Sequence, residues 1–251
     1  MRALSAPEII AHRGASHDAP ENTAAAFSLA WDQGADACEL DVRLTKDGRA
    51  VVIHDATTGR TTSENKRVSS QVIESLQMLD AGAWKGARWK GERIPTLGEA
   101  LETVPDGRRL FIEIKCGAEV LPRIGRALET SGKCARQIAI IGFNFATMRR
   151  AREHSPDSAI YWIASPKAWS RGGRPSVDTL IAKAKSARFD GLDLDCRFAI
   201  DREFVSRVKS AGLKLFVWTV NDAGTARRMA AAGVDGIATN RPLWLREQLA
   251  K

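Results

Sequence analysis

Long apolar runs and a leader segment are both missing from this sequence. No stretch approaches the roughly eighteen uninterrupted apolar residues of a membrane-spanning helix. Residues 1–8 have neither the basic start nor the apolar run of a secretory signal. We therefore expect a cytoplasmic protein with no stable membrane insertion.

Cysteine is scarce, and its spacing argues against a disulfide framework. The four cysteines lie far apart and form no CxxC pair, which favours reduced thiols. No GxGxxG follows any apolar run, which argues against an open, doubly wound sheet that binds a dinucleotide. No repeat and no linker divides the chain, so residues 1–251 are predicted to form one domain.

Positive charge is in excess but is not concentrated. The chain has 38 Lys and Arg against 30 Asp and Glu, a formal net charge of +8 that would suit an anionic partner. The basic residues are dispersed, as on solvated helix faces, and form no continuous stripe. The sequence therefore predicts no nucleic-acid partner.

The chain does contain a regular alternation of apolar strands and helices. Each of eight predicted strands is followed by a helix, and the strands begin near residues 8, 38, 110, 137, 159, 191, 214 and 234. Eight such units in 251 residues predict a TIM (β/α)8 barrel. A turn at residues 46–48 adds a hairpin after the second strand, and residues 56–93 are predicted to be a small insertion.

Polar residues end several of these strands, where barrel enzymes place their chemistry. Glu39 and Asp41 are two residues apart and leave the same face of their strand, as do Glu113 and Lys115. Three carboxylates converging in a barrel mouth would repel one another unless a cation lay among them. Oxygen ligands without a His/Cys cluster favour Mg²⁺ or Ca²⁺, and simple ion pairs with Arg13 or Lys115 are the alternative.

His12 and His54 each end a strand and are each followed by a charged residue. Cleavage of a phosphodiester needs one group to take a proton from the nucleophile and another to give a proton to the leaving alkoxide. Imidazole titrates near working pH and suits both tasks. Arg13 and Lys115 can hold the phosphate oxygens. Together these residues predict phosphodiester cleavage, and the order in which the histidines act stays open.

Other polar or aromatic residues also lie near the predicted strand ends. Trp218 could form an apolar wall against the carbon face of a glycerol or sugar, although core packing explains it nearly as well. Asp193, Asp195 and Asp235 are also expected near the barrel mouth, with no role assigned. His17 is expected to be a loop residue.

An ordered set of short motifs resembles the signature of glycerophosphodiester phosphodiesterases, in their cytosolic bacterial form. The motifs cover nearly the whole chain: HRG at 12–14, PENT at 20–23, ELDV at 39–42, TKDG at 45–48, HD at 54–55, RTT at 60–62, IPTL at 94–97, EIK at 113–115, VWTVN at 217–221 and GVDG at 233–236. Residues 63–66 (SENK) depart from the glycine-rich turn that usually follows RTT.

The resemblance implies a TIM barrel whose insertion caps the mouth. It implies a small-molecule substrate, a glycerophosphodiester such as glycerophosphocholine or glycerophosphoethanolamine, hydrolysed to glycerol 3-phosphate and an alcohol. The neighbouring glycerol hydroxyl would attack phosphorus, and water would open the cyclic phosphate. The implied roles are ligands of a divalent cation (Glu39, Asp41, Glu113), general acid and base (His12, His54) and phosphate contacts (Arg13, Lys115).

Two other functions stay open at this point. A lysophospholipase D or sphingomyelinase D acting on lipid head groups would share the barrel and both histidines, and the loop tryptophans Trp84, Trp89 and Trp169 are compatible with it. A barrel that only binds phosphorylated ligands or nucleic acid would require a missing catalytic group or a basic stripe, and the sequence shows neither. The preferred alcohol, the ion and the oligomeric state are not determined by the sequence.

Overall fold

Strands and helices alternate in the order that the sequence predicts. The computed structural model describes residues 6–169 and 175–250, without the side chains of residues 168 and 169. The strands are β1 (Glu8–His12), β2 (Ala37–Leu44), β3 (Ala50–Val52), β4 (Arg109–Ile114), β5 (Ile138–Gly142), β6 (Ala159–Ala164), β7 (Gly191–Asp195), β8 (Lys214–Trp218) and β9 (Gly236–Thr239). The helices are α1 (Ala24–Asp32), α2 (Ile73–Gln77), α3 (Leu97–Glu102), α4 (Leu121–Ser131), α5 (Phe145–His154), α6 (Val177–Ser186), α7 (Arg202–Ser210), α8 (Ala223–Ala232) and α9 (Pro242–Leu249).

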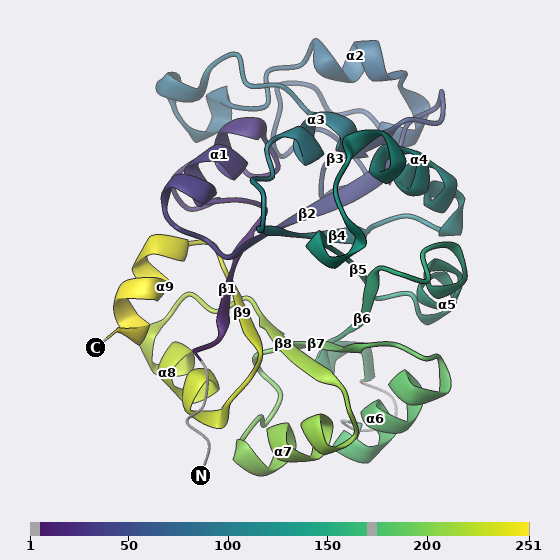
Figure 1. Ribbon diagram of the computed structural model, residues 1–251. Coiled ribbons are helices and arrows are strands. Elements are labelled where there is room, and N and C mark those ends of the chain that lie inside the picture. The colour runs from purple at the N-terminus through teal and green to yellow at the C-terminus, as the bar shows by residue number, and fades with distance from the viewer. Residues whose placement is uncertain (1–5, 170–174, 251) are drawn as a thin grey trace.

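Eight of the described strands close into a parallel barrel. Their order is β1-β9-β8-β7-β6-β5-β4-β2, and β1 pairs with β2 to complete the ring. The helices surround the strands, and β3 pairs with β2 in antiparallel fashion as the predicted hairpin (Figure 1). The structure therefore confirms the TIM barrel with an extra hairpin after its second strand.

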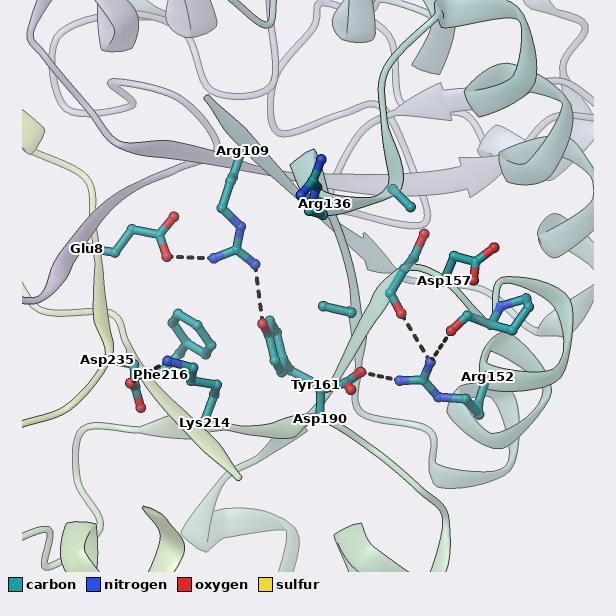
Figure 2. A pocket seen from close by; sticks show the side chains of 14 residues that line it. Glu8, Arg109, Arg136, Arg152, Asp157, Tyr161, Asp190, Lys214, Phe216 and Asp235 are labelled. Atoms are coloured by element: carbon teal, nitrogen blue, oxygen red, sulfur yellow. Dashed lines mark hydrogen bonds and ion pairs between the residues drawn. The ribbon is translucent and has the colours of Figure 1, made fainter. Parts of the chain in front are cut away.

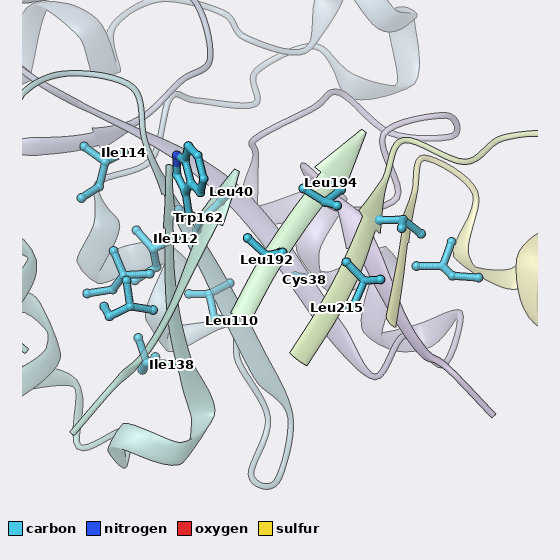
Figure 3. Close-up of a cluster of buried hydrophobic side chains, with 14 of the residues drawn as sticks. Cys38, Leu40, Leu110, Ile112, Ile114, Ile138, Trp162, Leu192, Leu194 and Leu215 are labelled. Carbon is cyan, nitrogen blue, oxygen red and sulfur yellow. The ribbon is translucent and has the colours of Figure 1, made fainter. Parts of the chain in front are cut away.

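Strict alternation along each strand separates the core from the barrel interior. Outward side chains such as Leu40, Ile112 and Leu192 are buried beneath the helices and form the main hydrophobic core (Figure 3). A second cluster, which includes Phe111 and Phe216, fills the middle of the barrel. Full burial of one such side chain stabilises the fold by about 1.5–3 kcal/mol. The same alternation directs every second residue at the carboxyl end of a strand into the barrel mouth.

The turn between β1 and α1 contains three residues in the left-handed region, Arg13, Gly14 and Asn22. Helix α1 begins at Ala24, with Thr23 as its N-cap. Asn22 has φ 60°, which is incompatible with a right-handed helix, so residues 20–23 form a turn. Gly14 has φ 78°, and a Cβ at this position would lie 2.6 Å from the backbone of Ala26.

We expect Gly14→Ala to destabilise the protein by about 2–3 kcal/mol, because alanine opposes both the left-handed φ and the close approach of α1. Urea denaturation of the variant should show a lower midpoint with an unchanged slope. Gly132→Ala is the matched control, because Gly132 has φ 67° but no atom within 4 Å of the added Cβ. Equal losses for the two variants would show that close approach contributes nothing.

Residues 56–93, which we call the cap, lie beside α1 and α3 and are visible in blue in Figure 1. The cap contains α2 and three short 3-10 helices: η1 (Val68–Ser70), η2 (Ala83–Lys85) and η3 (Ala87–Trp89). Its apolar side chains, among them Leu76, pack with Val51 and Ile53 of the hairpin in a small core of their own. Lys85 and Arg88 donate hydrogen bonds of 2.8 and 2.7 Å to backbone carbonyls of the β1–α1 loop.

Across the described residues, none of the helices combines the length and the apolarity that crossing a bilayer would require.

Candidate active site

A cavity of about 150 Å³ lies at the carboxyl ends of the barrel strands. Its walls are formed by twelve residues: His12, Arg13, Glu39, His54, Glu113, Lys115, Ile141, Phe143, Ile163, Asp193, Trp218 and Thr219. Seven of the eight site residues expected from the sequence are among them. The eighth, Asp41, is fully buried and groups with Glu39 and Glu113. All eight are therefore brought to one place.

Three carboxylates from β2 and β4 form a compact cluster. Glu39, Asp41 and Glu113 each offer an oxygen within 4.8 Å of the other two, and all three side chains are buried. Register explains this, because Asp41 lies directly beside Glu113 in the parallel pair β2–β4. Glu39 Oε1 and Asp41 Oδ1 are buried and have no hydrogen-bond partner among the described residues.

The protein neutralises this cluster only partly. Burial, and then the charges of Asp41 and Glu113, raise the pKa of Glu39 well above its usual value. Burial and the charge of Asp41 raise the pKa of Glu113 to about 7. Asp41 differs, because Lys115 and Arg13 outweigh its burial and lower its pKa. A hard divalent cation would relieve the unfavourable negative charge and would bind buried oxygens that accept no hydrogen bond, so the residues present fit such an ion.

Two cations border the carboxylates. The Lys115 ammonium lies 2.6 Å from Glu113 Oε1 and 3.3 Å from Asp41 Oδ1. The Arg13 guanidinium lies 3.2 Å from Asp41 Oδ2 and 2.9 Å from Glu21 Oε1. Arg13 has φ 58°, and its backbone N–H donates to Glu39 Oε2 at 2.9 Å. Both cations therefore line the cavity beside the acidic cluster, where they could meet a phosphate group.

The hydrogen-bond partner of His12 is a neutral side chain. Its Nδ1 lies 2.7 Å from Asn240 Oδ1, and because an amide oxygen can only accept, Nδ1 carries the hydrogen. The other nitrogen, Nε2, lies 4.0 Å from Glu39 Oε2. Burial and the charge of Arg13 lower the pKa of His12 to about 4. A neutral imidazole at pH 7 thus presents an unprotonated Nε2.

The hydrogen-bond partner of His54 is a charged side chain. Its Nδ1 lies 2.6 Å from Asp55 Oδ1, and Arg60 of the cap donates to the other oxygen of Asp55 at 2.6 Å. Hydrogen bonds from Arg60 and His54 outweigh burial and lower the pKa of Asp55 to about 2. Burial lowers the pKa of His54, whereas the hydrogen bond to Asp55 raises it. This carboxylate stabilises a protonated imidazole in a way that the Asn240 amide does not.

Aromatic and aliphatic side chains form the remaining wall of the cavity. The rings of Phe143 and Trp218 meet edge to face with centroids 5.6 Å apart, and Ile141 and Ile163 lie in the same wall. Phe143 also lies over the Lys115 ammonium, 5.7 Å from the ring centroid. Trp218 therefore lines the cavity and also packs against the cluster inside the barrel, so its position agrees with both interpretations that the sequence left open.

Several positioning residues were not found from the sequence. Asn22 donates to Asp41 Oδ2 at 2.8 Å, and Asn240 holds His12. Arg43 donates to the backbone carbonyls of His54 and Lys115 at 2.9 and 3.0 Å, which joins the two loops that carry these residues. Arg43 was detectable in principle, because it shares the inward parity of Glu39 and Asp41 on β2.

Two aspartates expected at the mouth do not reach the cavity. Asp195 is engaged by Arg197, whose Nε donates to Oδ1 at 2.8 Å, and by Ser165. Asp235 lies at the opposite end of the barrel, where Lys214 approaches it within 3.1 Å. The expectation for Asp235 is wrong because β9 begins at Gly236, so Asp235 precedes the strand.

Asp235 borders a larger cavity of about 470 Å³ at the amino ends of the strands (Figure 2). Its charged side chains are largely paired: Arg109 binds Glu8 at 2.7 Å and donates to Tyr161 at 3.2 Å, and Arg152 binds Asp190. No group of three potential metal ligands occurs there among the described residues. These contacts close the bottom of the barrel rather than form a second reactive centre.

A parallel barrel with acids, bases and cations gathered at its carboxyl end defines a TIM-barrel enzyme. Residues 12–243 match the glycerophosphoryl diester phosphodiesterase family. The glycerophosphodiester phosphodiesterase of Caldanaerobacter subterraneus is 39% identical over 241 residues, covering 93% of this chain and 94% of the relative. That of Bacillus subtilis is 28% identical over 250 residues, covering 93% and 83%.

A solved structure agrees with these relatives. An Oleispira antarctica phosphodiesterase in complex with the product sn-glycerol-3-phosphate superimposes with a TM-score of 0.87 at 31% identity, covering 98% of both chains. The chain belongs to the glycerophosphoryl diester phosphodiesterase family, as its motifs suggested, and is an enzyme of the phosphoric diester hydrolase class.

Proposed function

We propose that this enzyme hydrolyses glycerophosphodiesters, such as glycerophosphocholine or glycerophosphoethanolamine, to sn-glycerol 3-phosphate and an alcohol. One observation carries the proposal: a single small cavity is bordered by two imidazoles, two cations and a carboxylate cluster that is only partly neutralised. One imidazole bonds to a neutral amide and the other to a carboxylate. The product bound to the Oleispira relative supports the same chemistry. We also propose that the protein is cytoplasmic and that residues 1–251 form a single domain, with the cap at about residues 56–93.

A divalent cation, Mg²⁺ or Ca²⁺, is proposed to bind Glu39, Asp41 and Glu113. When bound, it would supply positive charge against the charge that develops on the phosphoryl oxygens. Arg13 and Lys115 serve the same end from the protein, because they face the cavity beside the cluster. Asn22 keeps one oxygen of Asp41 engaged and so fixes the orientation of that carboxylate.

The hydrogen-bond partner of Nδ1 in each histidine indicates which proton transfer that histidine performs. His12 Nε2 takes the proton of the glycerol hydroxyl next to the phosphate, and that oxygen attacks phosphorus to form a cyclic phosphate. His54, which Asp55 stabilises in its protonated form, gives the Nε2 proton to the departing alkoxide oxygen. In the second step water gives a proton to His54 and attacks phosphorus, and His12 returns its proton to the glycerol oxygen. No protein nucleophile is required.

The direct test is release of sn-glycerol 3-phosphate from a panel of glycerophosphodiesters with different alcohols, with and without Mg²⁺ or Ca²⁺. We expect release that requires one of these ions. Absence of glycerol 3-phosphate from every member of the panel would contradict the proposal.

The panel should include lysophosphatidylcholine, because a lipid-directed phosphodiesterase is the competing function. Met78 and Trp84 are 85% and 42% exposed on the cap, which gives that alternative two apolar contacts, while Trp169 has no described side chain. The size of the cavity argues against a lipid substrate, because about 150 Å³ is well below the roughly 300–1,000 Å³ of pockets for larger ligands. We expect turnover of glycerophosphocholine to exceed that of the lysolipid.

We expect Asp55→Asn to move the alkaline limb of the kcat/KM profile to lower pH. The hydrogen bond from His54 to the Asp55 carboxylate raises the pKa of His54, so its loss lowers that pKa and deprotonates the acid earlier as pH rises. The profile should be measured with saturating divalent ion. Asp18→Asn is the matched control, because Asp18 pairs with the exposed His17 at 2.7 Å, outside the cavity. An unshifted limb in Asp55→Asn would contradict the acid assigned to His54.

A further inference from the structure

One buried carboxyl in the cavity has no task in the chemistry described so far. Asp193 lies on β7, is only 5% exposed and lines the cavity. Its Oδ1 is buried and has no hydrogen-bond partner among the described residues. Trp218 donates to the backbone carbonyl of Asp193 at 3.2 Å and leaves the carboxyl free. A buried polar atom without a hydrogen bond is unfavourable, so Asp193 Oδ1 requires a partner.

The proposed divalent cation is not that partner. The carboxylate cluster whose oxygens lie within 4.8 Å of one another contains Glu39, Asp41 and Glu113, and it does not include Asp193. In the ring of barrel strands, β7 lies four strands from β2 in either direction, so the two strands face each other across the barrel. Asp193 is therefore opposite Glu39 and Asp41.

The surroundings of Asp193 are apolar. Its neighbours in the sheet are Ile163 on β6 and Phe216 on β8. Ile141 and Trp218 complete this side of the cavity. Burial, and then the charge of Glu113, raise the pKa of Asp193. A substrate hydroxyl can donate to Oδ1 whether or not the carboxyl is protonated, so the contact does not depend on its charge.

This placement matches one group of the substrate, provided that the proposed function holds. The phosphate of a glycerophosphodiester belongs beside Arg13 and Lys115, and the neighbouring hydroxyl is consumed by the attack on phosphorus. The glycerol carbons then extend across the cavity, with the terminal hydroxyl as the polar group still without a protein partner. We propose that Asp193 binds this terminal hydroxyl and thereby selects substrates in which it is free.

Selectivity follows from the cost of leaving Asp193 unpaired. A substrate that lacks the terminal hydroxyl, or carries an acyl chain on it, cannot donate to Oδ1. A site built to bind a hydroxyl discriminates strongly against the analogue without it. Asp193 thus distinguishes glycerophosphodiesters from lysolipids acylated at that oxygen, at the level of a single side chain.

The test compares two substrates and two proteins. One substrate is glycerophosphocholine, and the other is its 2-hydroxypropyl analogue, which keeps the attacking hydroxyl but has a methyl group in place of the terminal CH₂OH. We expect the wild-type enzyme to prefer glycerophosphocholine in kcat/KM by about 10–100-fold. Asp193→Ala should lower kcat/KM for glycerophosphocholine by a similar factor and change the analogue by less than about threefold, so that the preference disappears.

Two further variants separate binding from structural damage. Asp193→Asn keeps an oxygen acceptor in the same shape and should retain most of the preference. Asp195→Asn alters a carboxyl on the same strand that is engaged by Arg197, and it should leave the preference unchanged. Equal losses for both substrates in Asp193→Ala, or no preference in the wild-type enzyme that turns over both, would overturn the proposal. Failure of the wild-type enzyme to cleave either substrate would instead overturn the proposed function, and this assignment with it.

Discussion

Replacing either histidine by alanine is expected to lower kcat/KM for a glycerophosphodiester by about 10²–10⁴-fold, the usual contribution of a positioned general acid or base. His12 and His54 face the same cavity, and each is fixed through Nδ1, so each loses one proton transfer on substitution. Steady-state kinetics with saturating divalent ion measure the loss. His17→Ala is the matched control, because His17 is exposed and lies outside the cavity.

Stability must be separated from chemistry in these variants. His12→Ala leaves Asn240 Oδ1 without its donor, which costs about 1–3 kcal/mol if no water replaces it. His12→Asn avoids this cost, because its amide N–H can take the place of Nδ1 while nothing takes the place of Nε2. We expect His12→Asn to lose as much activity as His12→Ala and to unfold at a higher urea concentration. Retained activity in His12→Asn would contradict the role given to Nε2.

The leaving group can distinguish the acid from the base. Glycerophospho-p-nitrophenol releases a phenolate that needs little protonation, so an acid contributes little to its departure. We expect His54→Ala to lose less than about tenfold on this substrate, whereas His12→Ala keeps its full loss. Release of p-nitrophenol reports the first step alone. The opposite pattern would exchange the two roles.

The sequence predicts the barrel and its reactive residues because both depend on local periodicity. Apolar positions alternate along each strand, so Leu40 and Val42 fix the direction of Glu39 and Asp41 before any tertiary contact is known. Parallel register then places Glu113 beside Asp41. The main limit of this reasoning is the exact residue at which a strand begins. Asp235 shows this, because it lies just before Gly236, where β9 begins, and therefore at the amino end of the barrel rather than at the mouth.

Local sequence patterns do not identify the groups that position the reactive side chains. Asn240 supports His12 from 228 residues away, after the last barrel strand. The loop that carries His54 depends on Arg60 of the cap, which binds both Asp55 and Glu21, and Glu21 in turn binds Arg13. This chain of ion pairs joins the two histidine loops through a residue that the sequence only marks as part of a motif. Such contacts are set by the closure of the barrel, and no spacing rule specifies them.

Removal of the divalent ion should have an effect comparable to loss of a histidine. Chelation is expected to lower activity by at least about 10²-fold, with recovery on addition of Mg²⁺ or Ca²⁺. Glu113→Gln should lose both the recovery and the stabilisation that binding gives. At 100 times its Kd the ion adds about 2.7 kcal/mol of stability, which raises Tm by about 5–10 °C in a protein of this size. Asp195→Asn, a carboxyl outside the cluster, should keep the full thermal shift.

The affinity for the ion should increase with pH through neutrality. Burial and the charge of Asp41 raise the pKa of Glu113 to about 7, so below this pH a proton competes with the ion for the same oxygen. Glu39, whose pKa is also raised by burial and by the charges of Asp41 and Glu113, adds to the competition. Isothermal titration at pH 6, 7 and 8 in buffers of different ionisation enthalpy should therefore show proton release on binding and a Kd that falls as pH rises. An affinity independent of pH would mean that all three carboxylates are already ionised without the metal, and that Arg13 and Lys115 alone neutralise the cluster.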